Sequence, residues 1–482
     1  MNYGIVLQVL GSLFIIESLF MIPSLLISIY HKQVDTFAFL ITIMITIIFG
    51  FIFRRVKTQN KSINVKEGLA IVSFGWIGIS ILGALPLWIS HSTPTYVDAL
   101  FEIVSGFTTT GATVITNVEI LPLGILFWRS LTHWLGGMGV LVFTLSLLPA
   151  LGIGGFQIFK AESPGPIAGK IAPKIKDTAQ ILYTTYITIT ILQVVLLKLG
   201  GMNFFDSFVY TFGTVGTGGF ATKNASVGAY NNTYIHIIIG IFMILSGVNF
   251  SMYYSIFQGK RKEIIKDEEL KLYFGIIFVA VIAIGINLYG TVYSNLGFAF
   301  RDSFFQVGSI ITTTGYSTAN FDLWPTFSKG ILVLLMFIGG SAGSTAGGMK
   351  VIRILVTFKL IKREILKIFH PRAVIPIKVN DKVLPNETIA GINSFMGLYI
   401  LLFVCSTILV SLEQIDLVSA ATSVAATLGN IGPGLGFVGP TSTFNGYHSI
   451  TKLFFSLLML LGRLELFTII ALLAPKKWRK EI

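Results

Sequence analysis

The chain has 482 residues, of which 53% are hydrophobic and only 12% are charged, and its mean hydropathy is +0.79. These values lie outside the range of soluble globular proteins and exclude that class. The composition therefore predicts an all-α integral membrane protein, in which each spanning helix needs roughly 20 mostly apolar residues.

Ten apolar stretches are long enough to cross a bilayer. The first has no Lys or Arg before it and no clear small-residue cleavage site, so we expect an uncleaved span and not a removed signal peptide. The eighth stretch is interrupted by glycines. The predicted spans are 5–30, 36–53, 68–90, 124–150, 180–199, 234–257, 272–293, 328–365, 389–412 and 449–475.

Most of the 35 Lys and Arg residues lie in five short segments between or after these spans. All five fall on one side of the ten-span arrangement, which makes that side cytoplasmic and places both termini there. A net charge of +13 also suggests nucleic acid, but a nucleic-acid face needs clustered basic side chains among stacking aromatics, and here they are dispersed. We therefore expect a lipid bilayer, and no nucleic acid, around the chain. The segments are 54–67, 157–178, 258–271, 350–387 and 476–480.

Four times an Asp is followed thirteen positions later by a Gly, across a short and mainly apolar stretch. A helix of about 10–12 residues covers roughly half of the hydrocarbon core, so each stretch is expected to enter from outside and stop near the middle. An Asp suits the entering end, because a carboxylate is favourable beside the positive terminus of a helix. The pairs are Asp98 with Gly111, Asp206 with Gly219, Asp302 with Gly315, and Asp416 with Gly429.

The chain is thus predicted to consist of two N-terminal transmembrane helices, residues 1–66, and four units of outer helix, pore helix and inner helix (M1-P-M2). Each unit has an even number of full spans, so all four point the same way, unlike the inverted repeats of many secondary transporters. Four parallel units can close around one pseudo-fourfold axis. The predicted units are 67–178, 179–268, 269–385 (with a broken inner helix) and 386–482.

The four stretches end in turns rich in Gly and Thr. A cation that sheds its water needs inward backbone oxygens, which left-handed or alternating conformations supply and Gly reaches without a Cβ clash. Thr adds a hydroxyl with a stiff χ1. One Thr-Gly pair is more often an ordinary helix end or a helix contact, but four at matched offsets predict a cation filter. Its predicted residues are Thr109, Thr110, Gly111, Thr217, Gly218, Gly219, Thr313, Thr314, Gly315, Leu428, Gly429 and Asn430.

The inner helix of the third unit contains five glycines within ten positions. Each costs a helix about 1 kcal/mol relative to Ala, so we expect a loop, which the membrane interior tolerates only beside a cavity. That places the loop below the filter, as a gate; the alternative is close helix packing through small residues. The predicted gate residues in this run are Gly339, Gly340, Ser341, Gly343, Ser344, Thr345, Gly347 and Gly348.

Arg463 lies near the middle of the last predicted span. A lipid-facing Arg there costs at least about 2.5–3.5 kcal/mol, so we expect it to face the pore or the protein interior. On the pore axis it would repel a passing cation and anchor loop carbonyls as part of the gate. The alternatives are snorkelling or an ion pair with Glu465. Lys350, which ends the glycine run, is expected at the cytoplasmic boundary; the alternative is a lysine in the pore.

Other polar residues carry weaker signals. Glu102 lies in the first pore helix and is expected to hydrogen-bond behind the filter, whereas His133 is expected to be a packing residue. The single Cys405 allows no disulfide framework. Because no phosphate-binding glycine motif and no nucleophile with a base appear, we predict neither catalysis nor a cofactor in this chain.

Seven motifs agree in order with one family. The chain closely resembles the TrkH branch of the Trk/Ktr/HKT potassium-translocating proteins over essentially its whole length, including two leading helices that KtrB-type members lack. The motifs are TTTGAT (108–113), HWLGGMG (133–139), GTGGFAT (216–222), TTTGYST (312–318), GGSAGSTAGGMK (339–350), LGNIGPGLG (428–436) and LGRLELF (461–467).

The resemblance implies a pore-forming subunit of the bacterial cytoplasmic (inner) membrane that dimerises, conducts K⁺ at the filter residues and is controlled by a cytosolic nucleotide-binding partner of the TrkA type. Gly111 favours K⁺, because a Ser at the first filter glycine accompanies Na⁺ transport in plant HKT relatives. The fourth turn departs from the others, with Leu428 where they have Thr110, Gly218 and Thr314. Family members show a similarly divergent fourth turn.

Passive, gated conduction is the function that the residues favour. Its main rival is a secondary transporter that couples K⁺ to H⁺ or Na⁺. Coupling usually uses carboxylates inside spans, and the span interiors look nearly free of acids apart from Glu465. A membrane scaffold without flux would not need four filter-like turns.

Overall fold

The computed structural model describes residues 1–58, 63–139, 175–259 and 261–473. The end of the predicted span 124–150, most of the basic segment 157–178 and the segment 476–480 lie outside the described residues. Within them, six helices are long and apolar enough to cross a membrane, or up to eight if two bent helix pairs each count as one span. The all-α membrane architecture predicted from the composition is confirmed.

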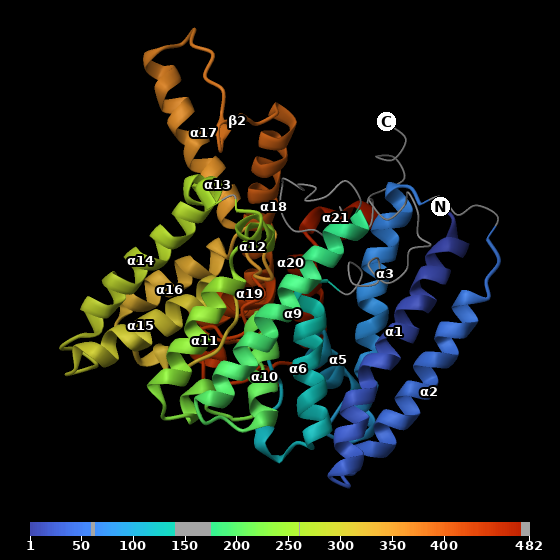
Figure 1. The fold of residues 1–482 in the computed structure, drawn as a ribbon. Coiled ribbons are helices and arrows are strands. Elements are labelled where there is room, and N and C mark those ends of the chain that lie inside the picture. Colours follow the sequence, from blue (N-terminus) through green and yellow to red (C-terminus); the bar gives the residue numbers. More distant parts are fainter. Residues whose placement is uncertain (59–62, 140–174, 260, 474–482) are drawn as a thin grey trace.

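The two leading helices form a hairpin along one side of the molecule, beside α3 (Figure 1). These are α1 (Tyr3–Tyr30) and α2 (Asp35–Arg54). Their backbones approach closely because neither carries a side chain where they cross: a Cβ at Gly11 would lie 2.5 Å from the carbonyl oxygen of Gly50. Gln33, in the connection between the helices, accepts a hydrogen bond of 2.8 Å from the N–H of Leu123, which fastens the hairpin to the first unit.

After the hairpin, the chain repeats the pattern of outer helix, pore helix and inner helix four times. The first set is α3 (Val65–Gly83) with α4 (Leu85–Ile89), α5 (Tyr96–Phe107) and α6 (Leu123–Gly137); the second is α9 (Ile175–Leu199), α10 (Phe204–Val215), α11 (Thr233–Ser246), α12 (Phe250–Phe257) and α13 (Arg261–Lys266); the third is α14 (Glu268–Leu288), α15 (Leu296–Ile311), α16 (Thr326–Ile338) and α17 (Val351–Phe369); the fourth is α18 (Asn386–Val410), α19 (Leu417–Leu428), α20 (Ser449–Arg463) and α21 (Leu466–Leu473). A short antiparallel hairpin, β1 (Lys378–Val379) and β2 (Lys382–Val383), follows α17, and both project from the body of the molecule (Figure 1). The exact limits of the four predicted units stay predictions.

The pore helices α5, α10, α15 and α19 are short because each is capped at a polar residue and then turns back. Three of them have 12 residues and α15 has 16, so none can cross the hydrocarbon core. A side chain accepts a hydrogen bond from a free N–H at each start, as N-caps do. The capping residues are Thr95, Asn203, Asn295 and Asp416.

Two inner helices that the sequence predicts as continuous spans are broken. The span 234–257 bends by 94° between α11 and α12, and the span 449–475 bends by 113° between α20 and α21. Both predictions of continuity are wrong. At each bend, a group from another helix occupies the space that a side chain would need, which only a glycine allows. A Cβ at Gly247 would lie 2.3 Å from the hydroxyl of Tyr273, and one at Gly462 would lie 2.1 Å from the carbonyl oxygen of Leu428. The break predicted in the third unit, between α16 and α17, is confirmed.

Candidate ion pathway and gate

Each pore helix ends in the same backbone motif. The residue after the C-cap has a left-handed backbone, and its N–H donates to the carbonyl oxygen two positions before the C-cap. The N–H of the following residue donates to the carbonyl oxygen three positions before the C-cap, as in a Schellman motif. In α5 these bonds run from Thr109 to Gly106 (3.0 Å) and from Thr110 to Ser105 (2.9 Å). A left-handed non-glycine residue costs roughly 1–2 kcal/mol, strain that typically persists at functional sites. The left-handed residues are Thr109 (φ 56), Thr217 (φ 56), Thr313 (φ 56) and Asn430 (φ 55).

A glycine with positive φ follows two residues later in every case, and these glycines bring the four turns together. Each one faces a carbonyl oxygen of the next turn so closely that no side chain fits between them. The contacts run from the first turn to the second, third and fourth and back to the first, so the turns form a closed ring. The distances from an added Cβ to that oxygen are 2.0 Å (Gly111 to Gly218), 2.1 Å (Gly219 to Thr314), 2.2 Å (Gly315 to Ile431) and 2.7 Å (Gly432 to Thr110).

We refer to residues 109–111, 217–219, 313–315 and 430–432 as the re-entrant turns. Their four positive-φ glycines line a cavity of about 130 Å³, together with residues of the loops that follow the turns, such as Lys223 and Asn224. The shared cavity and the ring of contacts place the four turns around one common space.

The fourth turn corrects the spacing rule used for the sequence. Asp416 caps α19, whereas Asp98 is already the third residue of α5, so counting thirteen residues from Asp416 stops three residues short. Leu428 is the last residue of α19, and Gly429 has a right-handed backbone at the helix end (φ −83). Asn430 is therefore the one residue of the predicted fourth set that lies in the turn, and Ile431 and Gly432 complete it.

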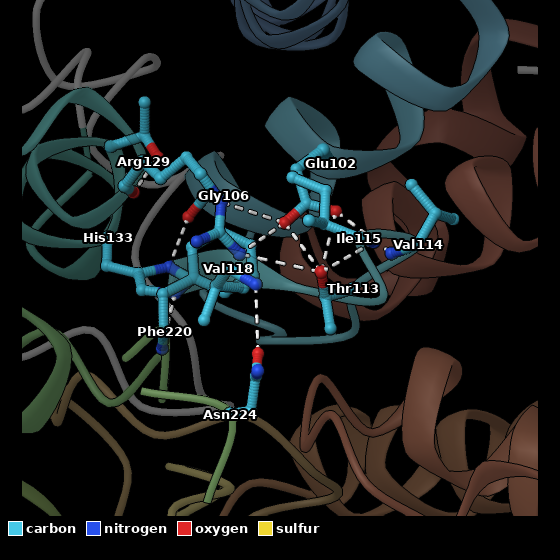
Figure 2. Close-up of polar contacts among 11 residues, drawn as sticks. Glu102, Gly106, Thr113, Val114, Ile115, Val118, Arg129, His133, Phe220 and Asn224 are labelled. Carbon is cyan, nitrogen blue, oxygen red and sulfur yellow. Dashed lines mark hydrogen bonds and ion pairs between the residues drawn. The ribbon is translucent and has the colours of Figure 1, made fainter. Parts of the chain in front are cut away.

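A buried ion pair supports the first turn from behind (Figure 2). Glu102 of α5 pairs with Arg129 of α6, and both side chains are at most 1% exposed. The same carboxylate accepts hydrogen bonds from the hydroxyl of Thr113 at 2.9 Å and from the N–H of Val114 at 3.0 Å. The prediction that Glu102 hydrogen-bonds behind the turn is confirmed, and the arrangement fixes the chain that leaves Gly111.

His133 of α6 joins the first turn to the second (Figure 2). The N–H of Phe220 donates to its Nε2 at 3.2 Å, so Nδ1 carries the proton and donates to the carbonyl oxygen of Gly106 at 2.7 Å. The imidazole ring of His133 also explains why Gly218 stands where the first and third turns have Thr110 and Thr314. A Cβ at Gly218 would lie 2.2 Å from this ring. His133 is fully buried and packs as predicted.

The acids near the outer ends of the pore helices hold neighbouring loops and helices in place. Asp98 forms a buried ion pair of 2.6 Å with Lys452 of α20, which links the first unit to the fourth. Asp206 accepts from the hydroxyls of Thr222 and Tyr230, at 2.7 and 2.5 Å. At the fourth helix, hydrogen bonds from the Ser419 hydroxyl and N–H hold the pKa of Asp416 below its usual value.

The chain between α16 and α17, residues 339–350, passes beneath the re-entrant turns and is here called the glycine loop. The N–H of Gly347 donates to the hydroxyl of Thr313 at 2.6 Å, and the N–H of Gly348 donates to the carbonyl oxygen of Gly429 at 3.0 Å. On another side, the hydroxyl of Thr345 donates to the carbonyl oxygen of Val215, the last residue of α10, at 3.1 Å. The glycine loop thus contacts the inner ends of three pore helices.

Arg463 ties this loop to the remaining unit. Its guanidinium donates to the carbonyl oxygen of Thr345 at 2.7 Å and to those of Gly136 and Gly137, at the end of α6, at 2.6 and 2.7 Å. The predicted anchoring of loop carbonyls is present, but Arg463 lies at the end of α20, beside the bend, and not in the middle of a continuous span. Glu465, the predicted alternative partner of Arg463, forms an ion pair with Arg353.

Three further charged residues lie inside the protein. Lys350 is only 2% exposed and donates to the carbonyl oxygen of Ala346, so its side chain folds back onto the glycine loop; its predicted place at the cytoplasmic boundary stays a prediction. Glu17, in the middle of α1, is 3% exposed and neither of its carboxylate oxygens has a hydrogen-bond partner among the described residues. Glu269, near the start of α14, contacts the glycine loop. The view that span interiors are nearly free of acids overlooked Glu17, whose position inside an apolar stretch was visible in the sequence.

Comparison with known proteins now places the chain. The family model described as TrkH, cation transport protein, matches residues 35–480. The chain belongs to the TrkH family. It is 37% identical to the Trk system potassium uptake protein TrkH of Escherichia coli K12 and 36% identical to that of Halomonas elongata, in each case over all of both chains. The crystal structure of the potassium transporter TrkH from Vibrio parahaemolyticus superposes with a TM-score of 0.89 at 34% identity, and the match covers 99% of this chain and 100% of that one.

Membership of the TrkH family confirms two predictions. The match to a solved TrkH structure supports the fold of four M1-P-M2 repeats preceded by two helices. The relatives are transport proteins, in agreement with the expectation that the chain is not an enzyme.

Proposed function

We propose that the chain is the K⁺-translocating subunit of a Trk-type uptake system and that K⁺ passes passively through the ring of re-entrant turns. The observation that carries this proposal is the cyclic contact of four positive-φ glycines with carbonyl oxygens of the neighbouring turns. The names of the relatives, potassium uptake proteins and a potassium transporter, support the choice of ion.

In this proposal, backbone oxygens of the re-entrant turns replace the water of K⁺ as it enters the ring. The negative ends of four pore helices point toward the same space and favour a cation there. Thr110 and Thr314 place hydroxyls at two of the turns, each within 2.8 Å of another Thr hydroxyl. The fourth turn offers Asn430 and Ile431 instead, so selectivity rests on the backbone more than on side-chain hydroxyls.

The glycine loop acts as the gate. It lies against the inner ends of pore helices from three units, and Arg463 adds a positive charge and three hydrogen bonds to the same region. Conduction then requires the loop to move away from the ring. Six of the eight predicted gate residues in the loop are buried and the other two are half-buried, which agrees with a loop held inside the protein and not in lipid.

The family and the charges support a proposal for the wider setting. We place the protein in the bacterial cytoplasmic membrane with both termini inside, as a homodimer that a cytosolic TrkA-like nucleotide-binding protein controls. The basic segments 258–271 and 350–387 support this orientation, because positive loops stay on the cytoplasmic side. The predicted division into units at 67–178, 179–268, 269–385 and 386–482 is kept in this proposal.

A planar-bilayer recording of the purified chain tests the proposal. With a K⁺ gradient across the bilayer, passive conduction predicts that the reversal potential follows the K⁺ gradient and does not change when a pH gradient is added. Absence of any K⁺ current from correctly folded protein would overturn the proposal.

Coupled K⁺/H⁺ transport is the second candidate, and Glu17 is the observation that favours it. A buried acid without a hydrogen-bond partner inside a span is the kind of group that proton coupling uses. Coupling predicts a reversal potential that shifts with the pH gradient and a Glu17→Gln variant that loses this shift. An unshifted wild-type potential removes this candidate.

A further inference from the structure

The backbone N–H groups of the glycine loop need partners, because the membrane interior supplies no water to replace them. Two of their acceptors are backbone oxygens of neighbouring units, Gly247 for Ser341 at 2.9 Å and Gly429 for Gly348 at 3.0 Å. Ala342 differs, because its N–H donates at 2.7 Å to the carboxylate of Glu269. Glu269 is only 7% exposed, and it comes from α14, outside the ring of pore helices.

Local structure explains how a carboxylate is held there. Glu269 is the second residue of α14, where the positive helix terminus favours an acid, and Asp267 caps that helix by accepting from the N–H of Leu270 at 2.8 Å. Lys350, at the far end of the glycine loop, also interacts electrostatically with Glu269. Glu269 is therefore attracted to the loop at two points, Ala342 and Lys350.

The start of α14 is in turn fastened to the cytoplasmic hairpin β1–β2. Asn380, at the tip of the hairpin, donates to the carboxylate of Asp267 at 2.7 Å and accepts from the N–H of Glu268 at 2.9 Å. Lys359 of α17 reaches the same place, pairing with Glu268 and donating to the carbonyl oxygen of Lys378 at 2.5 Å. The hairpin and the helix α17 thus hold the two residues that directly precede Glu269.

We propose that Glu269 is a positioning residue that latches the glycine loop in its closed place, and that the hairpin β1–β2 sets the position of this latch. A cytosolic partner that moves the hairpin or α17 would pull the start of α14, withdraw the carboxylate from Ala342 and free the loop. The inference rests on the proposed function, since it assumes that the loop is the gate, and it adds the residue through which a cytosolic signal reaches that gate.

Two substitutions of Glu269 separate the latch from a general structural role. Glu269→Ala removes the acceptor and should raise K⁺ flux into liposomes, without any partner protein, by about tenfold, because a lost hydrogen bond to a charged group shifts a two-state equilibrium by roughly that factor. Glu269→Gln keeps an oxygen for the Ala342 N–H and should stay within about twofold of the wild-type flux. Glu387→Ala, at an exposed acid in the first turn of α18, is the matched control and should change nothing.

The hairpin is tested by Asn380→Gly, which keeps the positive φ of this residue and removes only its amide side chain. We expect an increase in flux smaller than that of Glu269→Ala, and no further increase when both changes are combined, because they break the same link. The K⁺ to Na⁺ selectivity should be unchanged in every variant.

The outcomes distinguish the inference from the function it rests on. No K⁺ flux through the wild-type protein contradicts the proposed function. Wild-type K⁺ flux together with an unchanged or lowered flux in folded Glu269→Ala overturns the latch. An additive effect of Asn380→Gly and Glu269→Ala removes the hairpin from it.

Discussion

The re-entrant turns and the glycine loop are both non-helical backbone inside the membrane, but they are held in different ways. Each turn is closed by hydrogen bonds to its own pore helix, at most six residues back, as from Thr314 to Ser309 at 2.8 Å. The glycine loop depends on residues far away in the chain, including Gly429, Arg463 and Glu269. A re-entrant turn therefore keeps its backbone conformation when its pore helix moves, whereas the glycine loop keeps its position only while the units that contact it remain together.

Under the proposed function, this difference separates selection from gating. Moving the glycine loop breaks a few remote contacts and leaves the closing bonds of every turn intact. Damage to the loop should therefore change only the amount of flux, and damage to a turn should change only the selectivity.

We expect the largest effect from Arg463→Ala, which should raise K⁺ flux more than tenfold and leave selectivity unchanged. A guanidinium roughly 6 Å from a passing ion opposes it by about 2–3 kcal/mol at an effective dielectric of about 20. The variant also releases three carbonyl oxygens. K⁺ flux into liposomes is the measurement. The flux of Arg463→Lys, which keeps the charge, should lie between those of the wild-type protein and Arg463→Ala. Loss of flux with poor membrane expression would show that Arg463 holds the fold, and the charge barrier would be abandoned.

Gly315→Ser should lower the preference for K⁺ over Na⁺ by about tenfold, as the loss of roughly one oxygen contact implies, while the protein still folds. The new Cβ would lie 2.2 Å from the carbonyl oxygen of Ile431, so that oxygen must move, but no helix contact changes. Reversal potentials in mixed K⁺ and Na⁺ measure the ratio. Gly330→Ser in α16, where a Cβ meets no atom within 4 Å, is the control. An unchanged ratio removes this turn from the filter.

Replacing Gly339 and Gly348 by Ala should raise the leak through the protein about fivefold. Both residues have positive φ, and a Cβ at Gly339 would lie 2.3 Å from the carbonyl oxygen of Gly347. The substitutions should therefore destabilise the closed position of the loop by roughly 1 kcal/mol or more. Liposome flux without any partner is the readout. Wild-type flux would favour helix packing through small residues instead of a gate.

The smallest effect concerns the cytoplasmic surface. We expect residues 352–382 to dock the soluble regulator, so that charge reversal at Arg372 and Lys378, both exposed, weakens binding of a TrkA-like protein by about threefold for each charge. A pull-down before and after reversal measures it. Equal binding by both forms would leave these charges with the role of fixing the topology alone.

The local features of this molecule could be predicted from its sequence, and the first three turns show why. A pore helix, its end and its left-handed turn depend on residues that are neighbours in the chain, so Gly111, Gly219 and Gly315 were identified correctly as positive-φ positions. The fourth turn was placed three residues too early because the Asp used as its marker is the helix cap in α19 and an interior residue in α5. The hydrogen bond by which Asp416 caps α19 thus accounts for the error of three residues.

Features that depend on distant neighbours could not be predicted. The apolar pattern continues through the bends at Gly247 and Gly462, and the reason for each bend is a group from another helix. Lys350 opens the basic segment 350–387 and therefore suggests a boundary residue, although its side chain folds back to Ala346. The partner of Glu269 lies 73 residues away.

The most direct test of the account is the selectivity of Gly432→Ser beside Gly429→Ala. Gly432 has φ 99 and closes the ring against the carbonyl oxygen of Thr110, whereas Gly429 ends α19 with φ −83. Reversal potentials of both variants in planar bilayers should show a lowered preference for K⁺ over Na⁺ in Gly432→Ser and the wild-type ratio in Gly429→Ala. A wild-type ratio in Gly432→Ser, in protein that still conducts, would contradict a selective ring built from four turns.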